Sequence, residues 1–213
     1  MKDMNQLNRN KILADKVIKG LESRNMSGYY AETKEEALAK ALELIPEGSS
    51  IGWGGSVSVS EIGLREAVIN GNYEVFNRDN CQTPEEKREI ELKIFGSDFF
   101  LCSSNAITED GILVNIDGNS NRVAAIAYGP KKVIMIVGMN KVAKDFDAAL
   151  SRARNIAAPI NAQRFPLDTP CKKNGSCANC KSRDTICCEF LVTRYSRHAD
   201  RFHIILVNDE LGY

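Results

Sequence analysis

The feature that most constrains the fold of this chain is a set of short apolar runs that contain no polar alternation. Val133-Ile134-Met135-Ile136-Val137 is the clearest run, and Phe99-Phe100-Leu101-Cys102 is a second one. Strands that are buried on both faces have this composition, which is typical of a parallel sheet covered by helices. Segments with helical spacing separate the runs. The sequence therefore predicts an α/β fold with a largely parallel sheet.

The expected elements alternate along the chain, with helix starts marked by capping residues such as Thr33 and Thr83. Prolines at 159, 166 and 170 exclude a long helix in the last quarter. Residues 1–45 are expected to form an N-terminal helical region on the core, and 46–213 an α/β domain with a cysteine-rich segment at 169–188. Helices are expected at 5–24, 33–44, 57–70, 83–96, 122–128 and 142–156, and strands at 28–31, 73–76, 99–102, 112–114, 133–137 and 202–207.

Composition excludes several classes of partner. The chain has 213 residues, a 43% hydrophobic fraction, and 28 basic and 28 acidic side chains, which does not favour nucleic acid or an anionic membrane surface. No apolar run approaches the roughly 20 residues of a membrane span, and the N-terminus lacks the apolar core of a signal peptide. We expect a cytoplasmic protein with reduced cysteines. We expect the amphipathic helix at 5–24 to pack either on the domain or on another subunit, so the sequence is compatible with a homo-oligomer.

A glycine-rich stretch, G-W-G-G-S at 52–56, lies between a predicted strand and a predicted helix. Glycine lets a backbone pass close to a ligand, and a helix N-terminus offers free N–H groups and partial positive charge. The spacing is that of neither a Walker loop nor a G-x-G-x-x-G motif. Two interpretations remain: a tight turn that needs glycine, or an anion-binding loop formed by Gly54, Gly55 and Ser56. Trp53 would either stack on a ligand or fill the core.

Two further polar segments follow predicted strands. Residues 105–111 read N-A-I-T-E-D-G and residues 117–122 read D-G-N-S-N-R. Parallel sheets bind ligands outside the carboxyl ends of their strands, although Asn, Asp and Gly also populate ordinary turns. Together with the glycine stretch, these segments predict a cleft for a small anionic molecule, in which Arg122 could clamp the anion. The candidate ligand-binding residues are Gly54, Gly55, Ser56, Asn105, Asn115, Asn119, Asn121 and Arg122.

The motifs resemble those of one protein family. The run N-A-I-T-E-D-G-I-L-V-N-I-D-G-N-S-N-R-V-A at 105–124, G-P-K-K-V at 129–133, the glycine stretch, the terminal V-N-D-E-L-G-Y and the cysteine segment resemble the lactate-utilisation (LUD) domain family. The resemblance covers nearly the whole chain. It implies a Rossmann-like α/β fold similar to the ribose-5-phosphate isomerase, glucosamine-phosphate deaminase and CoA-transferase superfamily. It also implies a role in growth on lactate, with iron–sulfur redox proteins as candidate partners, but no particular reaction.

The resemblance also bears on the candidate catalytic residues. Residues 104–117 resemble the G-A-D…D-G…N-K-I-G segment of methylthioribose-1-phosphate isomerases, where the aspartate of G-A-D is catalytic. Asn105 stands at that position, and an amide is no carboxylate base. Glu109 resembles the glutamate nucleophile of CoA-transferases, and a solvated loop acid is the alternative. The sequence thus favours an accessory, anion-binding protein over an isomerase or acyl/CoA transferase acting through Glu109 or Asp117.

The last candidate residues are five cysteines that could bind a metal. They follow the pattern C-x5-C-x2-C-x6-C-C from Cys171 to Cys188. The spacing matches neither a zinc ribbon nor a bacterial ferredoxin. Free thiols, zinc and an iron–sulfur cluster all remain open, with Cys171, Cys177, Cys180 and Cys187 as candidate ligands.

Overall fold

The computed structural model describes residues 3–213, in which helices and strands alternate along most of the chain. The elements are α1 (Met4–Glu22), β1 (Ser27–Ala31), α2 (Lys34–Glu43), β2 (Ser50–Trp53), α3 (Val57–Glu61), α4 (Leu64–Asn70), β3 (Glu74–Phe76), η1 (Arg78–Asn80), α5 (Pro84–Phe95), β4 (Phe99–Cys102), β5 (Ala106–Thr108), β6 (Leu113–Asp117), α6 (Asn121–Ala127), β7 (Lys132–Gly138), η2 (Met139–Lys141), β8 (Val142–Ala143), α7 (Phe146–Arg152), η3 (Ala153–Ala157), α8 (Ala158–Ala162), α9 (Pro170–Asn174), β9 (Glu189–Thr193) and β10 (Phe202–Val207).

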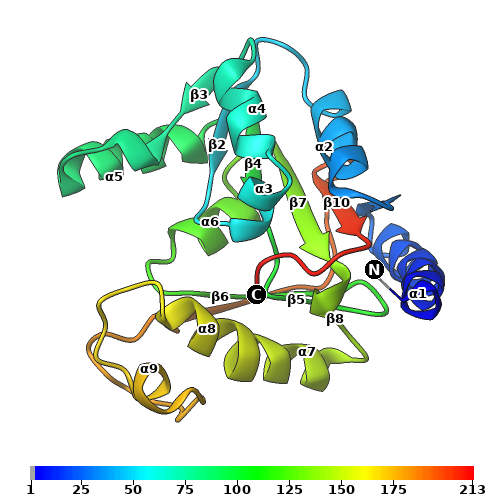
Figure 1. The fold of residues 1–213 in the computed structure, drawn as a ribbon. Coiled ribbons are helices and arrows are strands. Elements are labelled where there is room, and N and C mark those ends of the chain that lie inside the picture. The colour runs from blue at the N-terminus through cyan, green and yellow to red at the C-terminus, as the bar shows by residue number, and fades with distance from the viewer. Residues whose placement is uncertain (1–2) are drawn as a thin grey trace.

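The central sheet is parallel throughout, in the order β1-β10-β7-β4-β2-β3 (Figure 1). Both apolar runs are fully buried in it, as the sequence predicted. Val133 and Met135 of β7 pack with α1, α5 and α6, whereas Ile134 and Ile136 pack with α2, α3 and α4. The alternation of side chains along β7 thus builds two apolar layers, one on each face of the sheet. The expected α/β class with a mostly parallel, helix-flanked sheet is confirmed.

A second, mixed sheet lies across the carboxyl end of the first, in the order β8-β5-β6-β9 (Figure 1). β5 follows β4 after three residues, and β8 follows β7 through the single turn η2. One face of this sheet contributes Ile107 and Leu113 to the main core, and the other packs against α7 and η3. No strand was predicted within the polar segment 105–111, and Ala106–Thr108 of this segment form a strand of the second sheet.

Two predicted helices differ from those observed. The helix expected at 57–70 is broken at Gly63, whose φ of +75° is a left-handed conformation that suits glycine. The helix expected at 142–156 begins only at Phe146, because residues 142–143 pair with β5, and helical structure continues to Ala162. A π-helical stretch at Ala153–Ala157 precedes Pro159, and this wider turn accommodates the proline ring and its missing N–H.

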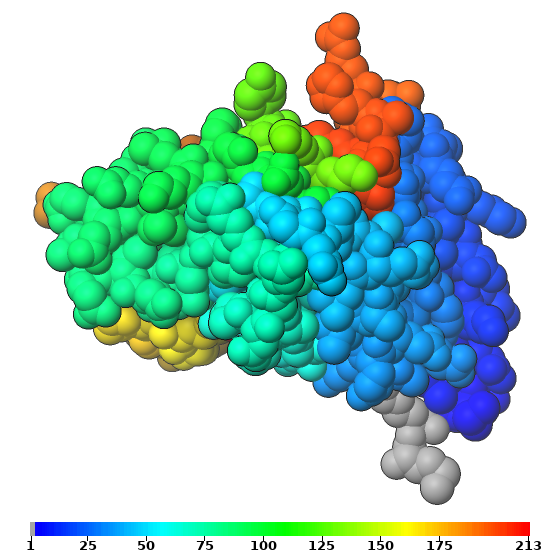
Figure 2. Space-filling view, turned by 90° about the horizontal axis from the view of Figure 1, so that it is seen from above, coloured from blue at the N-terminus to red at the C-terminus, as the bar shows by residue number. Residues whose placement is uncertain are grey.

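Figure 2 shows α5, in green, and α1, in blue, at opposite sides of the molecule. The N-terminal region supplies β1 to the edge of the central sheet as well as two helices. None of the helices in the described range combines the length and apolar character that crossing a bilayer requires.

Candidate functional site

A cavity of about 630 Å³ opens at the carboxyl end of the central sheet. Its walls come from the turn after β2, the segment after β4, the β6–α6 connection, the end of α8 and the C-terminal residues 212–213. The predicted residues Gly55, Ser56, Asn105, Asp117, Asn119, Asn121 and Arg122 line it. Gly54, Asn115 and Glu109 are not part of its lining.

The glycine stretch brings the backbone close to neighbouring elements. The Gly54 N–H donates to the Leu101 carbonyl at 3.2 Å, and a Cβ at Gly54 would lie 3.2 Å from Cδ of Arg122. Ser56 is the N-cap of α3, since its Oγ accepts from the Val59 N–H at 3.4 Å. Trp53 is buried in the core and does not line the cavity, so its side chain fills the core rather than stacking on a ligand.

Arg122 holds the loops together. Its Nη1 donates to Asn115 Oδ1 at 2.7 Å and to the Ser103 carbonyl at 3.3 Å. Its Nη2 donates to Asn105 Oδ1 at 3.0 Å and to the Ile116 carbonyl at 2.6 Å. With both terminal nitrogens occupied, the guanidinium positions two asparagines and the end of β6, and what it presents to the cavity is mainly its charge.

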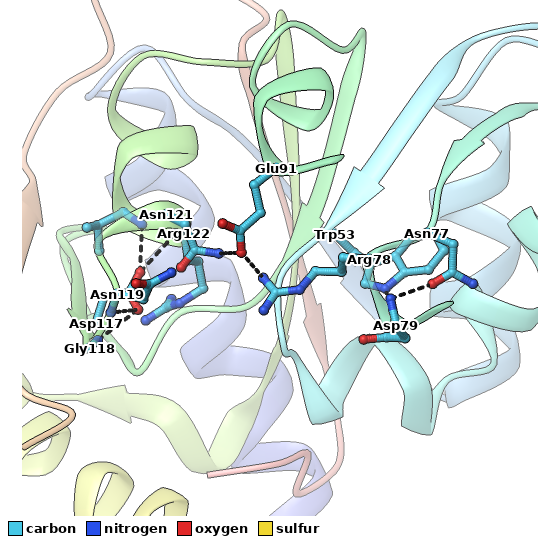
Figure 3. A network of polar contacts seen from close by, with 11 residues as sticks. Trp53, Asn77, Arg78, Asp79, Glu91, Asp117, Gly118, Asn119, Asn121 and Arg122 are labelled. Atoms are coloured by element: carbon cyan, nitrogen blue, oxygen red, sulfur yellow. Dashed lines mark hydrogen bonds and ion pairs between the residues drawn. The ribbon is translucent and has the colours of Figure 1, made fainter. Parts of the chain in front are cut away.

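Asp117 serves the start of α6 in a similar way (Figure 3). Its Oδ1 accepts from the N–H groups of Gly118 at 2.8 Å and Asn119 at 3.4 Å. Its Oδ2 accepts from the N–H groups of Arg122 at 2.9 Å and Val123 at 3.0 Å. A carboxylate at a helix N-terminus satisfies otherwise free donors and complements the helix dipole. The carboxylate is thus engaged by the backbone on both oxygens.

A polar network joins α6 to η1 along one side of the cavity (Figure 3). Glu91 of α5 accepts from Asn121 Nδ2 at 2.9 Å and pairs with Arg78 Nη1 at 3.5 Å. Next to Arg78, the Asp79 carboxylate accepts from Trp53 Nε1 at 3.2 Å. Glu91 therefore connects the polar segment at 117–122 with η1. The indole N–H of buried Trp53 holds the Asp79 carboxylate at the far end of this network.

Glu109 lies at the turn between β5 and β6, away from the cavity. It pairs with Lys16 at 2.5 Å and with Lys144 at 3.0 Å. The hydrogen bonds from Lys16 and Lys144 lower the pKa of Glu109. The structure therefore separates this candidate from the other predicted residues.

The floor of the cavity holds a lysine that the sequence analysis missed. Lys141, in η2 directly after β7, is 2% exposed. Its Nζ donates to Ser58 Oγ at 2.9 Å and to Ser103 Oγ at 3.0 Å. Burial and the nearby Arg152 and Arg122 lower the pKa of Lys141 to about 7. Its position just after a buried strand is the sequence signal that indicates it, as it does for the polar residues that follow β2, β4 and β6.

Residues 14–207 match the LUD domain family. The chain belongs to this family. The crystal structure of a DUF162 family protein from Deinococcus radiodurans is similar to this LUD domain, with a TM-score of 0.53 and 11% identity over 93% of this chain and 97% of that chain. At that identity the similarity shows the fold alone. The structure of eIF2B delta from Chaetomium thermophilum has a TM-score of 0.34 at 15% identity, over 67% of this chain and 57% of that one. No curated protein matches the chain.

Three more cations of this LUD domain line the cavity without having been predicted: Arg78, Lys87 and Arg164. Lys87 lies on α5 and is exposed, and Arg164 lies just after α8. Neither follows a strand of the central sheet. Their approach to the cavity depends on how α5 and α8 pack, which no local pattern in the sequence indicates.

The four predicted metal ligands of this LUD domain, Cys171, Cys177, Cys180 and Cys187, line a second, small cavity of about 70 Å³. As placed, the side chains of residues 3–213 form no group of three or more Cys, His, Asp or Glu that could hold a metal ion. The four sulfurs thus share a cavity without forming a ligand set. Burial, followed by the neighbouring Cys177 and Cys171 thiols, raises the pKa of Cys187 to about 11.

Proposed function

We propose that this LUD domain binds a small anionic molecule in the cavity at the carboxyl end of its central sheet. The observation that carries the proposal is the charge of the lining, which has more basic than acidic side chains. A volume of about 630 Å³ suits a small metabolite. The charged lining residues are Arg78, Lys87, Arg122, Lys141 and Arg164 on the basic side and Asp79 and Asp117 on the acidic side.

The two acids are already engaged within the protein. Both oxygens of Asp117 accept backbone N–H groups, and Asp79 pairs with Arg65 at 3.0 Å. On the basic side, Lys87 has no side-chain hydrogen bond or ion pair with any described residue. Within residues 3–213, Arg164 donates hydrogen bonds only from Nη1, to the Gly55 carbonyl at 3.1 Å and to Asn161 Oδ1 at 3.2 Å. Lys87 and Arg164 therefore have donors left for a ligand.

Isothermal titration calorimetry with inorganic phosphate, pyruvate and a sugar phosphate tests this proposal. The double variant Lys87→Gln and Arg164→Gln should bind the preferred anion at least tenfold more weakly, about 1.4 kcal/mol. Lys93→Gln is the matched control, because Lys93 is exposed on the same helix as Lys87 but does not line the cavity. Absence of binding to the parent, or equal affinity in the double variant, contradicts the proposal.

The wider role is proposed from family membership. We propose that the domain is an accessory protein of lactate oxidation and redox metabolism, and that its fold is related to the isomerase, deaminase and CoA-transferase superfamily. Loss of the protein should then slow growth on lactate and leave growth on other carbon sources unchanged. The alternative is an enzyme acting through Glu109 or Asp117. Turnover of sugar phosphates or acyl-CoAs that is abolished in Glu109→Gln or Asp117→Asn would favour that alternative.

A further inference from the structure

Lys141 is unusual because it is a buried cation without a carboxylate partner. No ion pair joins it to any residue in the described range 3–213, and its two hydrogen-bond partners are neutral hydroxyls. The acid that acts on it electrostatically is Glu61, whose Oε2 is already occupied by the Gly212 N–H at 2.8 Å. Buried lysines are rarely found unpaired, because a charged ammonium loses its hydration on burial.

The charged groups around Lys141 act mainly to lower its pKa. Arg152, whose Nε donates to the Asn140 carbonyl at 2.9 Å, and Arg122 both favour the neutral amine, whereas Glu61 and the thiol of Cys102 oppose them more weakly. With burial, this holds the pKa of Lys141 at about 7. A substantial fraction of the side chain is then an unprotonated amine at neutral pH, which is the nucleophilic form.

The two serines have different roles around the amine. Ser103 Oγ donates to the Ser104 carbonyl at 3.3 Å, so its lone pairs accept from Nζ and fix the position of the amine. Ser58 Oγ has Nζ as its only hydrogen-bond partner among the described residues, so its own proton is free to be transferred. Gly212 closes this corner, since a Cβ there would lie 2.8 Å from Ser58 Oγ and 3.4 Å from Nζ.

We propose that Lys141 is a nucleophilic amine that forms an imine with a small aldehyde or ketone bearing a carboxylate or phosphate group. This inference rests on the proposed anion site, which would hold the charged group while Nζ meets the carbonyl carbon. The Nζ lone pair forms the C–N bond, the two protons of the neutral amine move to the former carbonyl oxygen, and the C–O bond breaks as that oxygen leaves as water. The Ser58 hydroxyl relays these protons from nitrogen to oxygen.

Borohydride trapping tests the imine directly. The protein is incubated at pH 7.5 with pyruvate, glyoxylate or glyceraldehyde 3-phosphate, reduced, digested and analysed by mass spectrometry. The expected result is one reduced adduct per chain, located on Lys141, with at least one of these carbonyl compounds and with at least tenfold less labelling by uncharged acetone. The three probes also distinguish carboxylate from phosphate as the anionic group.

Two variants control the experiment. Lys141→Arg keeps a buried cation but is not a nucleophile at neutral pH, so it should lose the adduct. Lys144→Arg is the matched control, because Lys144 is exposed, lies three residues further on and pairs with Glu109, so it should keep the adduct. In the parent, the trapping rate should rise between pH 6 and 8 as Lys141 loses its proton, and Ser58→Ala should lower the rate at least fivefold.

The outcomes separate this inference from the anion site. Anion binding in calorimetry without an adduct on Lys141, or with labelling spread evenly over exposed lysines, overturns the imine proposal and leaves the anion site standing. An adduct on Lys141 that survives the Lys87→Gln and Arg164→Gln double variant supports the amine and rejects the proposed anion contacts. Absence of both binding and adduct rejects both.

Discussion

The floor of the main cavity and the cysteine segment at 169–188 are built on different principles. At the floor, the side chains of Arg122 and Asp117 each make four hydrogen bonds, and the residues of β6 that precede Asp117 are buried. The cysteine segment has one short helix, α9, and all of its residues from Lys173 to Ser176 are exposed. The floor is therefore part of the cooperative core, whereas the segment can open locally without unfolding the domain.

The two regions nevertheless touch. Thr185 and Ile186 line both cavities, and the Cys188 N–H donates to the Asp117 carbonyl at 2.9 Å. A weakly held segment thus forms one wall of a strongly held site. The order of the cysteine segment should therefore affect binding in the main cavity with little change in global stability.

Removing the guanidinium of Arg122 should have the largest effect. Arg122→Met leaves Asn115 Oδ1, which is fully buried, and two backbone carbonyls without their donor. We expect a loss of about 3 kcal/mol in the free energy of unfolding, measured with urea, because buried acceptors then lack partners. Arg164→Gln should change the same quantity by less than about 0.5 kcal/mol, since Arg164 is exposed. Equal effects of the two variants would contradict the contrast between floor and surface.

Lys141→Met should instead raise the free energy of unfolding. The folded chain lowers the pKa of Lys141 to about 7, so between about pH 7 and the usual lysine value the unfolded chain binds a proton that the folded chain does not. The free energy of unfolding of the parent should therefore rise with pH across that window, because the burial of the amine costs less once the amine is neutral. The variant has no amine at this position and should not show this rise. At pH 7 the variant should be about 1 to 3 kcal/mol more stable in urea unfolding, as is common when a buried charge is replaced by an apolar group. A pH-independent difference between the two proteins would contradict this prediction.

The sequence predicted the central sheet because its strands carry a strong signal. Runs such as Phe99–Cys102 contain no polar residue, which is the composition of strands that are buried on both faces. The second sheet gave no such signal. β5 is three residues long and β8 two, and both are stabilised by pairing with each other rather than by their own composition.

The candidate site was predicted in part for the same reason. The polar residues at 117–122 could be found because they follow a strand and share one short segment. The contact of Lys141 with Ser58 and Ser103 spans 83 and 38 residues of sequence, so only the packed fold brings these side chains together. Asn105 is a predicted ligand-binding residue and lines the cavity, and its Oδ1 also accepts from Arg122 and from the Ile116 N–H, a role that depends on the hairpin that was not predicted.

Changes in the cysteine segment should leave the core intact. If Cys171, Cys177, Cys180 and Cys187 bind zinc or an iron–sulfur cluster, Cys177→Ser and Cys180→Ser should both be cut by protease between residues 169 and 188, as should the chelated parent. The urea midpoint should move little, whereas anion affinity should fall, because Thr185 and Ile186 line both cavities. Cys81→Ser is the control, since Cys81 lies outside the segment. The metal prediction would be contradicted if the parent protein is isolated without metal, resists cleavage in this segment and is unaffected by chelator.

The smallest effect on stability is expected at Gly55, where the effect on binding should be large. Gly55 is exposed and lines the cavity, and a Cβ built there meets nothing within 4 Å. Gly55→Val should therefore change the free energy of unfolding by less than about 0.5 kcal/mol. The added side chain would nevertheless stand between the ligand and the backbone, so phosphate-like ligands should bind at least tenfold more weakly in calorimetry. Gly96→Val, at the exposed end of α5 and outside the cavity lining, controls for adding a branched side chain to a surface turn. Unchanged affinity in Gly55→Val would mean that the glycine stretch serves the turn into α3 and takes no part in binding.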